Sequence, residues 1–549
     1  MHQCRGFSRF AGRTSSIRKA KAPRRRPPVT EDLEPRRLLS LSLVVNTLQD
    51  SIDPVGSATV SLRDAITQAN SAGTPTNITF APNLNGSILL SNGQLEISSN
   101  MAIGGPGAGV ITIDAQSQSR VLQVDAGATS TISGLTMTNG RSNGEAIFSG
   151  GAILNDGTLT LTGVLVSNSR AATGFPDSPG GSGGGIYSDG TLTITNSAII
   201  GNTAGGGGAG LAQPDLGDDG GGGGFGGGIA NDGVLSVFNT TISGNAAGAG
   251  GAGGEGLPSV TLGEGGMGGN GGDGGGIVNG VFNTTATPTA TLINDTISEN
   301  TVGPRGPGGL GYISGFPGFP GGGEGVANEA GASLAIGNTI VANNNIQLEP
   351  GDTFGQFNSL GYNLIGDTGT SSGWTTTDQV GSSALPLNAL LAPLSNYGGP
   401  TQTYALMKGS PALNHGNNGQ VIQYSLNTDQ RGLSRIFNTV VDIGSYEAQP
   451  PALAGDVNHD GTVNFSDLVL LAQHYNSSVP LYELGDLNGD GIVNFPDLVI
   501  LAQNYNKTST AASAALQPQA TDSPAITTDA ATLHHKLMPS IRTTSKVRG

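Results

Sequence analysis

Two segments near the end of the 549-residue chain carry oxygen ligands at the spacing of calcium-binding loops. GDVNHDGTVNFSDLVLLAQHYN at 455–476 recurs as GDLNGDGIVNFPDLVILAQNYN at 485–506. Calcium takes about six to eight oxygen ligands, and a twelve-residue loop converges them from positions 1, 3, 5, 7, 9 and 12. The residues at these positions are Asp456, Asn458, Asp460, Thr462, Asn464 and Asp467 in the first loop, and Asp486, Asn488, Asp490, Ile492, Asn494 and Asp497 in the second.

The remaining loop positions fit the same chemistry. Position 7 of such a loop contributes a backbone carbonyl, and position 9 often acts through water. Gly461 and Gly491 stand at position 6, where the chain turns sharply. Asp467 and Asp497 stand at position 12, where an EF-hand has a bidentate Glu. The sequence therefore predicts two sites for Ca²⁺ and no other cofactor.

Each loop is followed by an apolar helical pattern, and no helix is expected before the first loop. Pro450 and Pro451 discourage an entering helix. Such a tandem of loop plus exiting helix resembles the type I dockerin domain, which implies a cohesin-like or other surface protein as partner. Phe465-Ser466 and Phe495-Pro496 depart from the cellulosomal pattern at the positions that set partner choice. The apolar face of the helices is expected to comprise Leu468, Leu471, Ala472 and Tyr475, and Leu498, Leu501, Ala502 and Tyr505.

An internal repeat organises the middle of the chain. Each copy of about 22 residues holds three short alternating runs separated by turns, and stacking successive copies buries the apolar residues that one copy leaves exposed. This pattern predicts a mainly β fold, a right-handed parallel β-helix of the pectin-lyase type, with about ten rungs over 76–346. The competing interpretation is a β-propeller, whose blades need about 40 to 50 residues. The copies begin at GGAILNDG (150), GGGIYSDG (183), GGGIANDG (226), GGGIVNG (274) and GEGVANEAG (323).

Two columns of equivalent residues follow from this alignment. The apolar column is expected to lie in the core, and the asparagine column to form a hydrogen-bonded ladder along the stack. The apolar residues are Ile153, Ile186, Ile229, Ile277 and Val326. The asparagines are Asn168, Asn202, Asn245, Asn300 and Asn343.

Glycine makes up 92 of the 549 residues and gathers in tracts between the copies. The tracts at 172–185, 205–228, 248–276 and 303–325 fall at one place in the repeat, so they are expected to leave one edge of the solenoid as long flexible loops. The run GFPGFPGGG at 315–323 is too short for a collagen triple helix.

Three further stretches resemble parts of secreted β-helix proteins. LEPRRLL at 33–39, in a basic segment 1–43, is similar to the LEPR-XLL export leader of planctomycete-type bacteria. The segment 44–75, with SLRDA at 61–65, resembles the CSLREA element and predicts an N-terminal helical cap in which Ser61 and Asp64 form a capping box. Residues 347–449 resemble the choice-of-anchor Q domain, which closes such helices, and are expected to form the C-terminal part of the solenoid. The domain organisation is completed by the dockerin-like pair 455–506 and a disordered tail at 507–549.

Charge and composition limit the partners. Residues 1–43 hold 11 basic and 3 acidic residues, whereas residues 44–506 hold 8 basic and 35 acidic ones, which argues against nucleic acid. Cys4 is the only cysteine, so no disulfide forms within the chain, and no apolar run is long enough for a transmembrane segment. We expect a secreted or cell-surface protein.

Three functions are compatible with these features. The first is a structural, adhesin-like β-helix that docks through its calcium module. The second is a glycoside hydrolase or polysaccharide lyase acting on extracellular polysaccharide. The third is a matrix or scaffold component assembled through the dockerin-like pair. The first is favoured because residues 44–346 contain no Lys or His for a lyase, and because Asp156, Asp189 and Asp232, which recur in register, stand in turns that need Asp for their own geometry. No catalytic residue is assigned.

Overall fold

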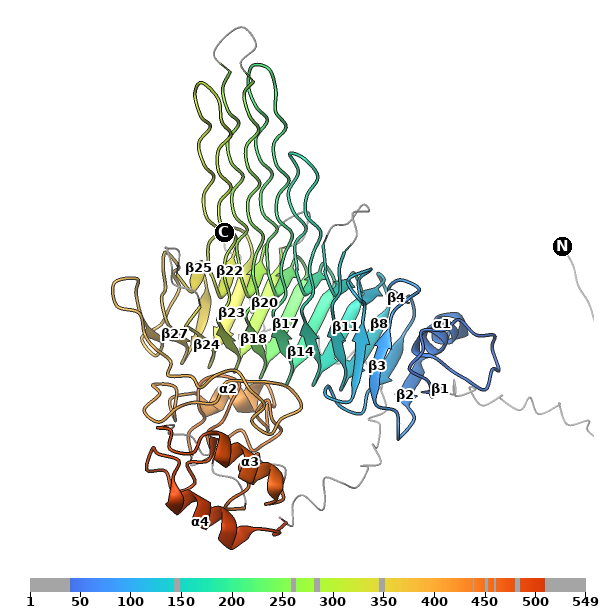
Figure 1. The fold of residues 1–549 in the computed structure, drawn as a ribbon, viewed down its shortest axis with the longest axis vertical. Coiled ribbons are helices and arrows are strands. Elements are labelled where there is room, and N and C mark those ends of the chain that lie inside the picture. The colour runs from blue at the N-terminus through green and yellow to red at the C-terminus, as the bar shows by residue number, and fades with distance from the viewer. Residues whose placement is uncertain are drawn as a thin grey trace, which may run out of the picture. The chain divides into compact units, whose positions relative to one another are not determined.

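Parallel β-strands dominate the structure, a computed structural model that describes residues 40–142, 149–257, 263–280, 287–344, 351–437, 439–449, 453–458, 461–478 and 484–508 (Figure 1). The predicted leader and tail lie almost entirely outside the described residues. The strands form three all-parallel sheets, named A, B and C here, of ten, ten and eight strands. Each turn of the chain adds one strand to each sheet, which confirms the predicted parallel β-helix and excludes the propeller.

Sheet A contains the longest strands and runs the length of the solenoid. Its order is that of the sequence, and each strand pairs with those of the neighbouring turns. Its strands are β1 (Leu41–Val45), β2 (Thr76–Phe80), β5 (Met101–Gly104), β8 (Thr129–Ser133), β11 (Thr158–Thr162), β14 (Thr191–Thr195), β17 (Val234–Phe238), β20 (Thr289–Ile293), β23 (Ser333–Gly337) and β26 (Asn358–Gly361).

Sheets B and C complete each turn with shorter strands. Sheet B contains β3 (Gly86–Leu89), β6 (Ile111–Asp114), β9 (Thr136–Thr138), β12 (Leu165–Ser167), β15 (Ala198–Ile200), β18 (Thr241–Ser243), β21 (Thr296–Ser298), β24 (Ile340–Val341), β27 (Leu364–Ile365) and β28 (Gln379–Val380). Sheet C contains β4 (Leu95–Ile97), β7 (Leu122–Val124), β10 (Ile153–Asn155), β13 (Ile186–Ser188), β16 (Ile229–Asn231), β19 (Ile277–Asn279), β22 (Val326–Asn328) and β25 (Thr353–Gly355).

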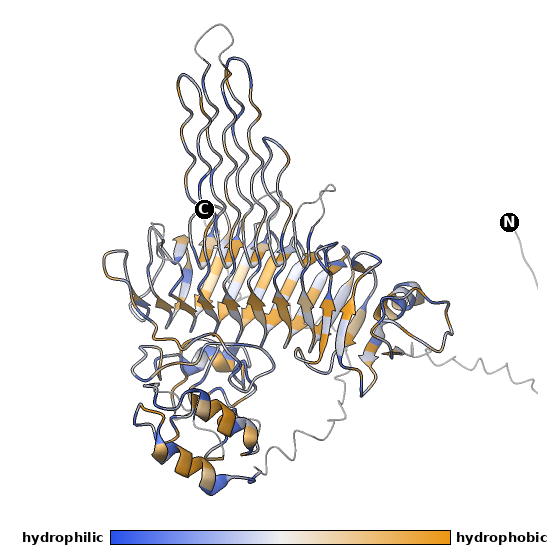
Figure 2. Cartoon of the chain, in the orientation of Figure 1, coloured by the Kyte–Doolittle hydropathy of each residue, from blue (hydrophilic) through white to orange (hydrophobic). Residues whose placement is uncertain are grey.

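The predicted apolar column forms part of the core. Ile153, Ile186, Ile229, Ile277 and Val326 pair in that order across sheet C, and each is fully buried. Figure 2 shows the hydrophobic residues gathered along the strands of the solenoid. The stack begins earlier than expected, because β1 starts at Leu41, within the segment assigned to the leader. Strands β25 to β28 lie within 347–449, the segment expected to form the C-terminal part of the solenoid.

The asparagine ladder exists, but the sequence alignment was wrong by one residue at both ends. Asn202 Nδ2 donates to Asn245 Oδ1 at 3.0 Å, and Asn245 Nδ2 donates to Asn300 Oδ1 at 2.9 Å. The next member is Asn344, not Asn343, and Ser169 takes the place predicted for Asn168. Asn168 and Asn343 have φ of 51° and 60° and occupy the left-handed turn position before the ladder, where asparagine is also favoured.

The N-terminal cap is confirmed as a helix on the first turns of the solenoid. Helix α1 (Leu62–Ala72) begins at Ser61, which forms the predicted capping box with Asp64. The face with Leu62, Ala65, Ile66 and Ala69 is buried. Arg63 fixes the cap, because its Nε lies 2.6 Å from Asp50 Oδ1 and its guanidinium donates to two backbone carbonyls.

The glycine tracts differ most from the prediction, because they form a regular array instead of flexible loops. The glycine array comprises 171–184, 205–226, 248–257, 263–274 and 303–322, and its segments run side by side away from the solenoid (Figure 1). Their backbones are hydrogen-bonded every third residue, as in Gly207 N to Ala249 O and Gly210 N to Ala252 O. Three residues per turn is the period of a polyproline II helix.

Residues 387–449 pack against the outer face of the solenoid through polar groups as well as an apolar cluster. Helix α2 (Asn418–Gln423) lies in this segment. Ser445 N donates to Thr296 Oγ1, and Asn239 Nδ2 donates to Thr428 O. Arg435, fully buried, reaches the carbonyls of Asp442 and Gly444. No helix among the described residues is long and apolar enough to span a membrane.

Candidate functional site: the paired loops

The two predicted calcium loops fold as one unit. Helix α3 (Phe465–Gln473) follows the first loop, and helix α4 (Phe495–Asn504) follows the second. Val463 N donates to Lys507 O and Val493 N donates to Ser477 O, so each loop pairs with the residues that follow the other loop's helix. Among the described residues, the apolar core of the pair comprises six buried residues: Val457, Val463, Leu471, Leu487, Val493 and Leu501. A core of this size does not support a fold without further stabilisation.

The carboxylates at position 12 close the loops. Asp467 Oδ1 accepts hydrogen bonds from the N–H groups of Val457 and Asn458 at 2.8 and 3.1 Å, and its Oδ2 accepts one from Asn464 N. Asp497 makes the same three bonds in the second loop. Both side chains are fully buried. Each therefore ties the beginning of its loop to the N-terminus of its helix and brings positions 1 to 3 beside position 12.

The carboxylates at position 1 are buried in the same way. Asp456 and Asp486 are 3% exposed, and one oxygen of each accepts a bond from the glycine at position 6. The second oxygen of Asp486, Oδ1, is buried and has no hydrogen-bond partner. Burial raises the pKa of Asp486, and the carboxylates of Asp497 and Asp490 raise it further against the bond from Gly491. An unpartnered, desolvated carboxylate oxygen fits a cation ligand.

Positions 3 and 5 lie at the exposed side of the second loop. Asn488 Nδ2 donates to Asp490 Oδ2 at 2.9 Å, and Asp490 N donates to Asn488 Oδ1 at 2.8 Å. Ile492 N donates to Asp490 Oδ1 at 2.9 Å, so the backbone N–H of position 7 lies beside the side chain of position 5. In the first loop, Asp460 lies outside the described residues. In the second loop, the carboxylates of Asp490 and Asp497 lie close enough to Asp486 to raise its pKa.

The asparagines at position 9 serve first as helix caps. Asn464 Oδ1 accepts from Ser466 N at 2.7 Å, and its Nδ2 donates to the carbonyl of Thr462 at position 7. Asn494 is the N-cap of α4. No group of three or more His, Cys, Asp and Glu side chains arranged for a metal was found among the described residues, which include Asp486, Asp490 and Asp497 of the second loop but not Asp460 of the first.

The exiting helices bury part of their predicted apolar face and expose the rest. Leu471 and Leu501 are buried, whereas Tyr475 and Tyr505 are each 40% exposed. Phe465 and Phe495, the first residues of the two helices, are 67% and 65% exposed. The two halves of the unit therefore present the same aromatic pair to solvent.

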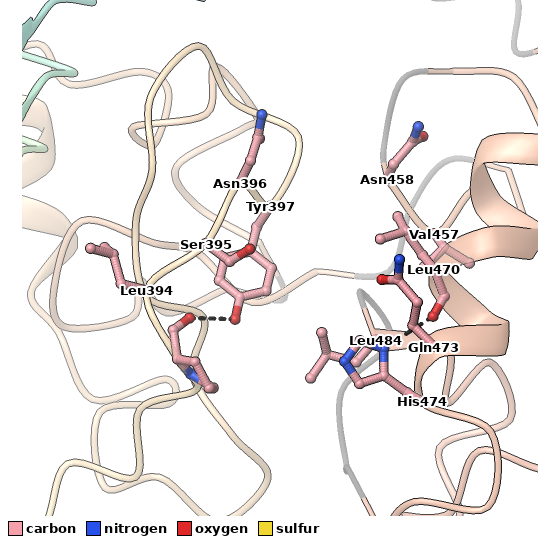
Figure 3. Close-up of a pocket in the computed structure, with 11 residues that line it drawn as sticks. Leu394, Ser395, Asn396, Tyr397, Val457, Asn458, Leu470, Gln473, His474 and Leu484 are labelled. Atoms are coloured by element: carbon pink, nitrogen blue, oxygen red, sulfur yellow. Dashed lines mark hydrogen bonds between the residues drawn. The ribbon is translucent and has the colours of Figure 1, made fainter.

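A hollow of about 310 Å³ lies beside the first loop (Figure 3). Val457, Asn458 and His474 line one side, and the segment 393–397 lines the other. Tyr397 Oη donates to Pro393 O, and His474 Nδ1 lies 3.0 Å from Leu470 O. The described lining residues include no carboxylate and no second histidine, so the hollow holds no acid–base pair.

The recurring aspartates of the solenoid come together more closely than turn geometry alone requires. Burial raises the pKa of Asp156 to about 6, with the neighbouring carboxylates of Asp189 and Asp125 adding to it and Arg120 opposing it. Tyr187 Oη donates to Asp232 Oδ2 at 2.9 Å. This row has paired carboxylates but no described pocket around it.

A second group of carboxylates had no signal in the sequence. Glu324, Asp352 and Asp367 come from separate segments and are all buried. Burial, together with the neighbouring carboxylates of Asp352 and Asp367, raises the pKa of Glu324 to about 8. Asp352 ends the asparagine ladder by accepting from Asn344 Nδ2 at 2.7 Å. This group thus belongs to the end of the asparagine ladder, whose register could not be read from the sequence.

No protein-family model and no characterised protein matches the sequence.

Proposed function

We propose that this is a secreted or cell-surface β-helix protein with a structural, adhesin-like role, which docks to another protein through a calcium-dependent, dockerin-like pair of loops. The observation that carries the proposal is the partnerless, buried Oδ1 of Asp486 in a unit with six buried core residues. A unit of that kind is completed by a bound cation, because metal binding supplies folding free energy.

Calcium is the cation that the ligand set favours. All predicted ligands are carboxylate, amide or backbone oxygens, which hard cations prefer, and neither loop offers sulfur among them. Asp456 and Asp486 at position 1 and Asp460 and Asp490 at position 5 would hold the ion directly. When bound, calcium neutralises carboxylates that otherwise repel one another.

The exposed aromatic residues support a docking role for the same unit. Phe465 and Phe495 are exposed at equivalent places, and exposed aromatic residues are typical of protein interfaces. The partner is a cohesin-like or other surface protein. Because the two faces carry matching residues, either loop-and-helix half offers the partner a similar surface.

The test is calorimetric titration of the chelator-treated, full-length protein with calcium and with magnesium. We expect two calcium sites per chain, with Kd in the range of about 10⁻⁷ to 10⁻³ M, and much weaker magnesium binding, because magnesium demands a tighter octahedron. Asp460→Ala and Asp490→Ala should each remove one site, whereas Asp215→Ala, in the glycine array, should remove none. Absence of binding heat at millimolar calcium would refute the proposal.

A polysaccharide-active enzyme is the alternative, and one observation favours it. The shared environment of Asp156 and Asp189 raises one carboxyl pKa to about 6, which is the arrangement of a general acid beside a general base. Turnover of pectin, alginate or a neutral glucan that disappears in Asp189→Asn would establish this function. Turnover that survives in Asp189→Asn would place any catalysis elsewhere on the chain.

A further inference from the structure

The glycine array has two layers of backbone packed without side chains between them. Its outgoing segments are 205–213, 248–257 and 303–312, and its returning segments are 216–226, 264–274 and 313–322. Gly221 N donates to Gly208 O, Gly251 N to Gly221 O, and Gly306 N to Gly269 O, so the layers are bonded to each other along their length. A Cβ on Gly306 would overlap the carbonyl oxygen of Gly251. Glycine is therefore required where a backbone carbonyl of one segment approaches the α-carbon of another this closely.

Every third residue of the returning layer points outward. In the middle segment Gly265, Gly266, Gly268 and Gly269 are buried, whereas Met267 is 52% exposed. The same period exposes a straight row of apolar residues on the last segment: Ile313 (51%), Phe316 (75%) and Phe319 (74%). Successive members are about 9 Å apart along the axis, at about 3.1 Å per residue.

This row is rigid and is supported by polar neighbours. Phe319 N donates to Asn270 Oδ1 at 2.9 Å, and Met267 N donates to Asp219 Oδ1 at 2.7 Å. Asn270, Asp219 and Glu264 are exposed on the same layer, between the apolar residues of the three segments. The face therefore alternates apolar surfaces with hydrogen-bonding groups on a fixed backbone.

The outer edge of the last returning segment, 313–322, lacks most of the N–H donors that a further backbone segment would need in order to pair with it. In the middle returning segment, the N–H groups of Gly265, Gly268 and Gly271 donate to the last segment. The equivalent positions of the last segment are Ser314, Pro317 and Pro320, and proline has no N–H to donate. A second copy of the chain therefore cannot extend this layer.

The edge of the outgoing layer offers donors instead. Arg305, Gly308 and Gly311 occupy the positions at which Gly250, Gly253 and Gly256 donate to the neighbouring segment. Their N–H groups donate to no described acceptor. The segment with Phe316 and Phe319 is thus hydrogen-bonded to one whose edge N–H groups recur at the same three-residue spacing and donate to no described acceptor.

We infer that the last returning segment binds an extended, uncharged polysaccharide chain along Ile313, Phe316 and Phe319. Sugar rings offer apolar C–H faces for stacking and hydroxyl groups for the neighbouring donors and carboxylates, in a linear repeat. The strongly acidic body of the protein repels uronates and anionic lipid headgroups. A bilayer would have to accept Asp219 and Glu264 beside the apolar row, which costs free energy. This inference supplies a ligand surface for the adhesin-like role and rests on that role, but not on calcium.

The test measures depletion of the purified full-length protein from solution by cellulose, chitin and mannan, with pectate, alginate and phosphatidylcholine vesicles as comparison probes. We expect binding to at least one neutral polysaccharide and to none of the others. Phe316→Ser with Phe319→Ser should weaken that binding by about tenfold or more, the loss typical of aromatic anchors. Leu310→Ala, an equally exposed apolar residue of the outgoing layer, should bind as the parent does.

Two further results separate this inference from the others. Binding to the polysaccharide should persist with excess EGTA, whereas failure of the calcium proposal appears only in the calorimetric titration. No depletion by any neutral polysaccharide, or equal depletion of the double serine variant, would overturn the inference. Sedimentation with vesicles that is lost in the double variant would overturn it in favour of a lipid surface.

Discussion

The solenoid and the paired loops stabilise the same chain in opposite ways. The solenoid stacks fully buried aliphatic residues turn after turn, and Asn202, Asn245 and Asn300 satisfy one another inside it. The paired loops bury six aliphatic residues and leave a carboxylate oxygen of Asp486 without a partner. The comparison shows that the solenoid is held together by its own buried side chains, whereas the described part of the paired loops has few of them and contains an unpartnered carboxylate oxygen.

Ile229→Asp should have the largest effect and should be confined to the solenoid. Ile229 is fully buried between Ile186 and Ile277, and an unpaired carboxylate there costs several kcal/mol, about enough to unfold the neighbouring turns. Circular dichroism should report loss of β signal. Calcium binding by the loops should survive, and its loss would show that the two regions fold as one.

Calcium removal should have the next largest effect and should be confined to the loops. An ion present at about 100 to 1,000 times its Kd stabilises the folded unit by about 2.7 to 4.1 kcal/mol. Hydrogen exchange in the presence of EGTA should accelerate for the amides of α3 and α4 and stay unchanged for β14 and β17. Equal protection of α3 with and without EGTA would mean that the small core suffices alone.

Asn245→Ala should destabilise the solenoid by about 1 to 3 kcal/mol. The substitution removes the side-chain acceptor of the buried Asn202 N–H, which is left unsatisfied, and one of the two donors to Asn300 Oδ1. Asn343→Ala is the matched control, because Asn343 occupies a turn and lies outside the ladder. A larger loss of thermal stability in Asn343→Ala than in Asn245→Ala would restore the register expected from the sequence.

The smallest predicted effect is a pH dependence of the solenoid. Burial raises the pKa of Glu324 to about 8 and that of Asp352 to about 6, so the folded solenoid holds protons that the unfolded chain releases near pH 4. Stability should therefore fall as pH rises from about 4 to about 8. Glu324→Gln should flatten the upper part of this curve, whereas Glu255→Gln, at an exposed site, should leave it unchanged. A parent curve that rises over this range would contradict the assignment.

The solenoid could be predicted because apolar and polar residues alternate in each copy of the repeat. An aliphatic residue that must be buried, such as Ile186, has an equivalent in every copy. The register of the asparagine ladder was harder to predict, because asparagine is favoured both in the ladder and at the left-handed position before it. Asn343 and Asn344 are adjacent examples of these two positions. The spacing of the loops also predicted that Asp467 and Asp497 lie beside position 1.

The regular structure of the glycine array was not predicted, because the residues that form its backbone contacts are glycines. Flexible linkers are also rich in glycine, so composition could not distinguish Gly250, Gly253 and Gly256 from unstructured chain. The distinguishing signal was the spacing of the residues that are not glycine, such as Glu264, Met267 and Asn270 at every third position. Pro317 and Pro320 keep the same period on the last segment.

The way in which the array is held together has a thermal consequence. Heat capacity of unfolding comes from apolar surface exposed to water, and polar surface lowers it. The contacts of Gly251, Gly269 and Gly306 are made between backbone groups, with hydrogen bonds in place of buried aliphatic side chains. Melting of the array therefore adds enthalpy with little or no positive heat capacity, and its stability does not pass through a maximum on cooling as that of the solenoid does. In cold water the array stays ordered at temperatures where hydrophobic packing weakens.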